Sequence, residues 1–134
     1  MPLNKNYLIL FIGVAISGSL LYFYFDPSYN KIFPPCPFYT LTHLYCPGCG
    51  SQRAFHDLLH GDIISASGHN LLFVASLPLV AYSGVISVFN VFVEKKVEQR
   101  FFSSPTLATG VLIVVLLFAV LRNIPVMPLL WLAP

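Results

Sequence analysis

Three long stretches without a charged side chain set the limits on how this chain can fold. They are Tyr7–Phe25 (19 residues), Leu71–Val93 (23 residues) and Pro105–Leu121 (17 residues). A helix needs ~20 apolar residues to cross the hydrocarbon core of a bilayer, and ~17 is the lower end of the range. Charged residues make up only 9% of the 134 residues, against roughly a quarter in soluble domains. We therefore predict an all-α membrane protein, one membrane domain over residues 1–134 with about three transmembrane helices.

The first apolar stretch could also be a cleaved signal peptide, because Lys5 precedes it. Its end is rich in large aromatic residues rather than the small ones that a cleavage site needs, which favours a retained span. Basic residues gather in the short segment 94–104. Since basic loops tend to stay in the cytoplasm, we expect a cytoplasmic N-terminus and an extracytoplasmic loop over residues 26–70.

Loop 26–70 contains all three cysteines and all four histidines of the chain. Its first half, residues 26–50, is rich in proline and should be irregular. The second half predicts a short amphipathic helix over Gln52–His60, with Ser51 as N-cap and a glycine as its stop. Asp62 should cap a further turn, Asn70 should cap the second span, and Pro78 should bend that span.

The motif Cys46-Pro47-Gly48-Cys49-Gly50 is the sharpest chemical signal in this loop. Two cysteines two residues apart in a tight turn can point both sulfurs at one zinc ion, which then needs two further ligands. Cys36 is the best third ligand. The candidates for the fourth are histidines of the same loop: His43, His56 and His60.

Two other interpretations of the same cysteines stay open. Cys46 and Cys49 could form a redox pair, with Cys36 as the resolving thiol, because Cys49 precedes a predicted helix N-terminus that favours its thiolate. Alternatively, the cysteines only brace a proline-rich loop. The metal-site interpretation implies zinc as the cofactor, whereas the redox and bracing interpretations require no cofactor. His69 is better explained as a polar residue beside the membrane.

Charged residues around the loop have structural rather than catalytic interpretations. Arg53 and Asp57 are i, i+4 neighbours on the predicted helix, a pairing of small energetic effect. Arg122, at the edge of the third span, is costly there unless it finds a partner. With three spans it emerges on the same side as loop 26–70, so it could meet Asp57, Asp62 or a thiolate. We expect Arg122 to hold the loop against the spans.

Taken together, these residues resemble a bacterial family of small membrane proteins known as domain of unknown function 2752. The resemblance rests on short motifs spread over residues 36–125: Cys36-Pro37-Phe38, Cys46-Pro47-Gly48-Cys49-Gly50-Ser51-Gln52-Arg53-Ala54, Gly61-Asp62, Asn70 and Arg122-Asn123-Ile124-Pro125. Gln52 stands where the family usually has threonine, and Leu71 where proline often follows the asparagine. The resemblance implies a bacterial inner-membrane protein and supplies no reaction.

The leading functional hypothesis is an accessory subunit or assembly factor of a larger membrane complex, with the Cys/His loop as its docking element. The chain has no Ser/His/Asp triad in order and no phosphate-binding loop, which favours a protein that is not an enzyme. A net charge of +2 without a basic face argues against a nucleic-acid partner. The alternatives are a membrane thiol-disulfide oxidoreductase using the CPGC motif and a metal carrier or sensor.

Overall fold

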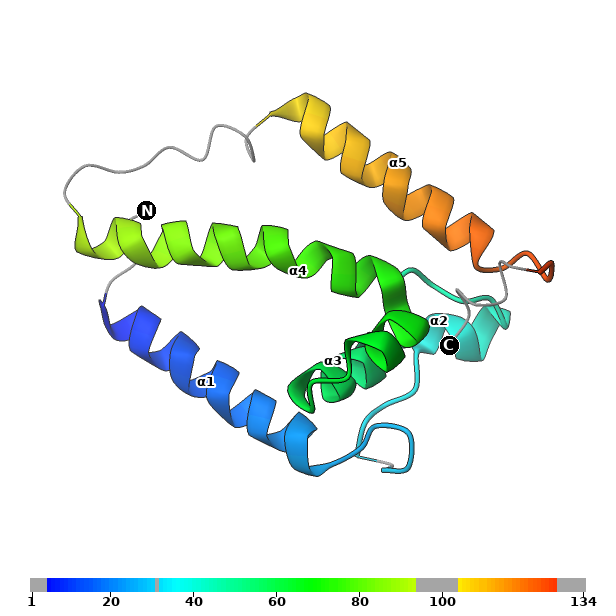
Figure 1. Cartoon of the computed structure of the whole chain (residues 1–134), viewed down its shortest axis with the longest axis horizontal. Coiled ribbons are helices and arrows are strands. Elements are labelled where there is room, and N and C mark those ends of the chain that lie inside the picture. Colours follow the sequence, from blue (N-terminus) through cyan, green and yellow to red (C-terminus); the bar gives the residue numbers. More distant parts are fainter. Residues whose placement is uncertain (1–4, 31, 94–103, 128–134) are drawn as a thin grey trace.

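The chain forms a set of helices joined by turns in a computed structural model that describes residues 5–30, 32–93 and 104–127 (Figure 1). All regular elements of the described residues are helices, which confirms the predicted all-α class. The basic segment on which the predicted orientation depends, residues 94–103, lies outside the described residues. The helices are α1 (Lys5–Tyr24), α2 (Pro37–Thr42), α3 (Ser51–Leu59), α4 (Ile63–Phe92) and α5 (Pro105–Leu121).

Each predicted apolar stretch lies in a helix. Helix α5 has the predicted bounds, with Pro105 in its first turn, where a missing backbone N–H leaves no hydrogen bond unmade. By length and composition, the part Ile63–Asn90 of α4 is able to cross a membrane, while Ile9–Tyr24 and Pro105–Leu121 are shorter apolar helices. None of the apolar window in α4 is buried within the chain.

Helix α4 is broken at Asn70, where the backbone leaves helical geometry (φ −158°, ψ 93°). The break therefore lies at Asn70 rather than at Pro78, where a bend was predicted. The Asn70 side chain stabilises the new helix start, because its Oδ1 accepts a hydrogen bond from the backbone N–H of Phe73 at 2.9 Å. This confirms the predicted cap. Asp62 caps the first part of α4 in the same way, through the N–H of Ser65 at 2.9 Å.

Two local predictions in loop 26–70 need correction. The proline-rich half contains a short helix, α2, because Pro37 stands in its first turn and leaves no inner hydrogen bond unmade. The N-cap of α3 is Gly50 rather than Ser51. Gly50 has a φ of 82°, which favours glycine, and the Ser51 hydroxyl is used elsewhere, as an acceptor for Asn70.

Helix α3 connects the N-terminal helix to the rest of the chain. Ala54 of α3 and Ala66 of α4 are fully buried, and small side chains there allow the two helices to approach closely. On the other side, the Tyr22 ring of α1 lies 5.4 Å from the ring of Phe55 and 4.7 Å from that of Phe33. In Figure 1, α2, α3, the start of α4 and the end of α5 gather at one side, and the long helices extend away from it.

Candidate functional site

The three cysteine sulfurs lie close together at the side of the molecule where α2, α3, the start of α4 and the end of α5 gather. Cys36 precedes α2, and Cys46 and Cys49 lie in the turn before α3. The Cys36 and Cys46 sulfurs are 3.3 Å apart, those of Cys46 and Cys49 are 3.1 Å apart, and all three lie within 4.8 Å of one another. All three are free thiols. Cys36, 10 residues before Cys46 in the sequence, is thus brought to the CPGC turn, as the metal and redox interpretations both require.

The CPGC turn is built by hydrogen bonds within the motif. The N–H of Cys49 donates to the carbonyl of Cys46 at 3.0 Å, and the N–H of Cys46 donates to the Cys49 sulfur at 3.2 Å. Gly50 then takes the left-handed conformation that turns the chain into α3. An N–H directed at a sulfur favours its thiolate form, which is the form that binds metal ions.

The sulfur spacing allows one metal ion to be shared. A Zn–S bond of ~2.3 Å places tetrahedral sulfurs about 3.8 Å apart, whereas a disulfide requires about 2.05 Å. The observed distances of 3.1 and 3.3 Å lie between these values, and the third sulfur stays beside the other two. The three cysteines could therefore hold a metal ion, with no element singled out by the geometry.

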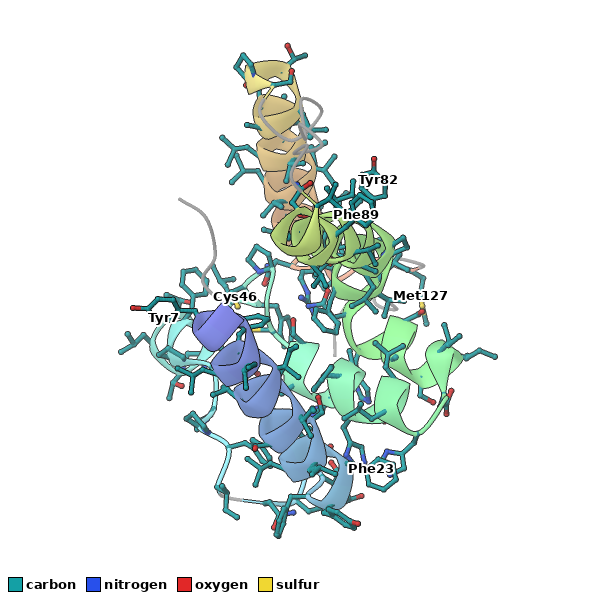
Figure 2. All side chains as sticks on the ribbon, turned by 90° about the vertical axis from the view of Figure 1, so that its left-hand side faces the viewer. Tyr7, Phe23, Cys46, Tyr82, Phe89 and Met127 are labelled. Carbon is teal, nitrogen blue, oxygen red and sulfur yellow. The ribbon has the colours of Figure 1, made fainter. Side chains whose placement is uncertain are left out.

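The histidine candidates for a fourth ligand lie elsewhere. His56 Nδ1 is 2.6 Å from the backbone carbonyl of Tyr22, and the His60 ring stacks on Phe23 at 4.5 Å. Both histidines are on the face of α3 that turns to α1, and Figure 2 shows Phe23 well apart from Cys46. His43 caps the end of α2 with a φ of 56°. Among the described residues, the cluster with metal-binding geometry consists of the three cysteines.

Arg122 at the end of α5 is buried against the CPGC turn, with 2% of its surface exposed. Its Nη1 donates to the carbonyls of Cys46 at 3.0 Å and Cys49 at 3.1 Å. The guanidinium also lies over the rings of Phe118 and Tyr45, 5.0 and 5.7 Å from their centroids. Arg122 thus contacts the loop as expected, but through backbone carbonyls rather than through Asp57 or Asp62.

Two asparagines complete the contacts around the turn, and only one of them carried a sequence-based expectation. Asn70 is buried, and its Nδ2 donates to the carbonyls of Pro47 at 2.9 Å and Cys49 at 3.1 Å and to the Ser51 hydroxyl at 3.0 Å. Asn123 exchanges two hydrogen bonds of 2.8 Å with the backbone of Tyr45. Only the capping role of Asn70 was predicted, because an asparagine beside a helix start gives no sign of a distant acceptor.

We call this assembly the cysteine hub. It consists of the three cysteines, the turn 45–51, and the three polar side chains that hold the turn: Asn70, Arg122 and Asn123.

The remaining charged candidates lie outside the cysteine hub. Asp57 pairs with His69, with 3.4 Å between Oδ2 and Nε2, rather than with Arg53. Asp62 serves as a helix cap, and hydrogen bonds from Ser65 lower the pKa of its carboxyl group. His69, set aside in the sequence interpretation, is therefore a partner of Asp57.

The thiols of the hub differ in acidity. The backbone N–H of Tyr39 lowers the pKa of Cys36 to about 7, which favours a thiolate near neutral pH. Burial raises the pKa of Cys49 to about 12. A positive ion among the sulfurs would oppose that burial effect, since metal coordination stabilises the thiolate.

Residues 36–84 match the family described as Protein of unknown function (DUF2752). The match covers less than half of the chain, and we call residues 36–84 the DUF2752 segment. No curated protein and no solved structure matches the chain significantly. The DUF2752 segment holds the three cysteines and Asn70, but it ends before α5, so Arg122 joins the hub on the strength of its contacts. The predicted family resemblance is confirmed over this segment.

Proposed function

We propose that this protein is a membrane-anchored accessory subunit or assembly factor of a larger membrane complex, with the cysteine hub as its docking element. A divalent metal ion, with zinc as the first candidate, closes the hub and makes it rigid. The protein resides in a bacterial inner membrane, with a cytoplasmic N-terminus, three spans and the hub on the extracytoplasmic side. The observation that carries this proposal is the convergence of three free thiols, held by buried polar side chains, at one end of spread apolar helices.

Exposed apolar side chains support the membrane part of the proposal. Phe11 of α1 is 71% exposed, Val85 of α4 is 69% exposed and Val120 of α5 is 61% exposed. Soluble monomers rarely expose continuous apolar surface on this scale, because water penalises it. A lipid environment removes the penalty for all three helices at once.

A shallow, open apolar face along α1, which we call the groove, supports the partner part of the proposal. Small residues on a membrane helix let a second helix approach closely, and a Cβ atom added at Gly13 or Gly18 would meet nothing within 4 Å. We therefore assign a helix of the partner complex to this groove. The groove is lined by Ile9, Leu10, Gly13, Val14, Ser17, Gly18 and Leu21.

The test compares two variants that add the same side chain at open positions. Gly18→Ile fills the groove, whereas Gly110→Ile adds the same bulk on α5, where a Cβ also meets nothing within 4 Å. Tagged proteins are purified in mild detergent from their native membrane, and the co-purifying membrane proteins are quantified. We expect a defined partner with the wild type and with Gly110→Ile, and its loss with Gly18→Ile. A wild type that stays alone, even after cross-linking in the membrane, would contradict the docking role.

A thiol-disulfide oxidoreductase is the second candidate, favoured by the 3.3 Å between the partly exposed Cys36 sulfur and that of Cys46. The sequence-based version of this reaction uses Cys46 and Cys49 as the redox pair and Cys36 as the resolving thiol; the structure favours exchanged roles, because Cys36 is the more acidic thiol. In the exchanged version the Cys36 thiolate attacks a disulfide of the substrate, and one substrate sulfur leaves as a thiolate. The Cys46 thiolate then attacks Cys36, which releases the second substrate thiol and leaves a Cys36–Cys46 disulfide. Two electrons pass to the substrate, and a dithiol reductant must restore the hub.

The Cys46→Ser variant tests the second candidate, because it removes the resolving thiol. An oxidoreductase should accumulate a mixed disulfide with its substrate, visible on a non-reducing gel, while Cys36→Ser should accumulate none. Absence of any trapped species in both variants would reject this candidate.

A further inference from the structure

The guanidinium of Arg122 is buried without a matching negative charge among the described residues. Its Nη1 donates to backbone carbonyls, but its Nε and Nη2 are buried and have no hydrogen-bond partner among the described residues. The acidic and basic side chains that approach within 4 Å in the described part of the chain are Asp57 and His69, and neither is among the hydrogen-bond partners of Arg122. A buried cation without a counter-charge is strongly unfavourable, so the native hub needs an anionic group at this place.

The cysteine sulfurs are the groups placed to supply that negative charge. Arg122 binds the carbonyls of Cys46 and Cys49 themselves, and its charge interacts with both thiols. The guanidinium cannot move away easily, because Phe118 and Tyr45 cover its faces and Asn123 fixes the adjacent end of α5 to Tyr45.

We propose that Arg122 is the counter-charge of a metal–thiolate centre. Three thiolates and one divalent cation carry a net charge of −1, which a single guanidinium neutralises. The three thiol protons leave to solvent when the ion binds, as metal coordination by cysteine requires. The hub is thus built for a thiophilic divalent cation of the zinc class. This inference rests on the metal-binding part of the proposed function and adds a residue outside the DUF2752 segment to the site.

The expected size of the effect follows from electrostatics. Two unit charges about 6 Å apart at an effective dielectric constant of ~20 change a binding constant by about 100-fold. Removing the charge of Arg122 should weaken metal binding by that order, whereas a lysine at the same position should retain most of it. If Arg122 acted only through its hydrogen bonds, both variants should lose similar metal affinity, because lysine cannot reproduce the several N–H donors of the guanidinium.

The experiment measures Zn²⁺ affinity of the full-length protein in detergent, by competition with a chromophoric chelator. Co²⁺ is the spectroscopic probe, because its absorption bands report sulfur coordination. The variants are Arg122→Met, Arg122→Lys and Leu112→Ala. The last one truncates an exposed side chain of α5 without changing charge, and circular dichroism shows whether each variant keeps its helices.

We expect Arg122→Met to lose about 100-fold in Zn²⁺ affinity, with Arg122→Lys and Leu112→Ala within about tenfold of the wild type. Equal losses in the methionine and lysine variants, or no loss in either, would overturn the counter-charge role while leaving the metal centre in place. If the wild type itself binds neither Zn²⁺ nor Co²⁺ through sulfur, the metal centre of the proposed function fails, and this inference fails with it. An unfolded Arg122→Met leaves the lysine variant as the decisive comparison: a tenfold or larger loss there argues against the proposal.

Discussion

The cysteine hub and the long apolar helices differ in how much of their side-chain surface is buried and bonded within the chain. In the hub, buried side chains such as Asn70 and Arg122 bond to backbone atoms far away in the sequence. Along α1 and α5, large side chains such as Phe11 and Leu112 are mostly exposed. Helix α5 is fastened to the loop chiefly at its end, through Arg122 and Asn123. Buried long-range hydrogen bonding of the described residues is therefore concentrated in the hub, whereas these helix surfaces stay exposed.

This difference separates the two sources of stability. Hydrogen bonds in the hub satisfy buried carbonyls, and the loss of a buried donor leaves them without a partner. Under the proposed membrane location, the exposed apolar side chains gain their stabilisation from lipid or a partner helix rather than from this chain. Substitutions in the two regions should consequently differ in cost even when the side chains are of similar size.

The largest effect on stability should come from Asn70→Leu. The substitution preserves bulk but removes the donor to Pro47, Cys49 and Ser51 and the cap at Phe73. We expect the free energy of unfolding in detergent to fall by about 3 kcal/mol, because buried acceptors and a helix start lose their partner. Asn30→Ala is the control, since the Asn30 side chain donates a local hydrogen bond to the Asp26 carbonyl, and it should cost less than about 1 kcal/mol. Equal effects would remove the distinction between the hub and the rest of the chain.

A smaller effect is expected from Asn123→Ala. This variant loses two hydrogen bonds to the backbone of Tyr45, at a position that is only partly buried. The free energy of unfolding should fall by about 1–2 kcal/mol, and thiol-labelling of Cys46 should accelerate as the end of α5 loosens. Leu112→Ala on the exposed side of α5 serves for comparison, with an expected change below about 0.5 kcal/mol. A larger cost for Leu112→Ala than for Asn123→Ala would show that α5 is held along its length.

The smallest effect should come from Asp62→Ala at the start of α4, and it should depend on pH. Hydrogen bonds from Ser65 lower the pKa of Asp62 below its ordinary value of 3.8. The carboxylate cap therefore stabilises the protein above pH 3.8, and this contribution is lost as the pH falls through the lowered pKa. The thermal stability of wild type and variant should differ at pH 7 and converge as the pH falls below the lowered pKa of Asp62. A constant difference across that range would mean that the charge of Asp62 has no part in the cap.

Local patterns in the sequence predicted the elements well, and long-range pairing was harder to predict. The uncharged stretches gave the helices because apolar composition and helix length are local properties, and α5 has the predicted bounds. The convergence of Cys36 with the CPGC motif was likewise predicted from residue type. The choice of His56 and His60 as ligands was less successful, because their shared helix face says nothing about its direction, and the structure turns it toward α1.

The partners of Arg122 also show that long-range contacts are hard to predict from a sequence. Sequence reasoning placed Arg122 beside the loop and offered Asp57, Asp62 or a thiolate as its partner, because charged side chains are visible in a sequence and backbone carbonyls are not. The structure gives it the carbonyls of Cys46 and Cys49. Asn123 was missed as a contact for the same reason, since its partner is the backbone of Tyr45.

The metal content and thiol count of the native protein test the central claim most directly. The full-length protein is purified in mild detergent without chelator, its bound metals are quantified, and its thiols are counted after denaturation under non-reducing conditions. We predict one divalent ion and three thiols per chain. In the folded protein the bound ion should protect all three thiols from labelling. One thiol per denatured chain and no bound metal would mean that two cysteines form a disulfide, and would contradict the account of the hub as a metal–thiolate centre.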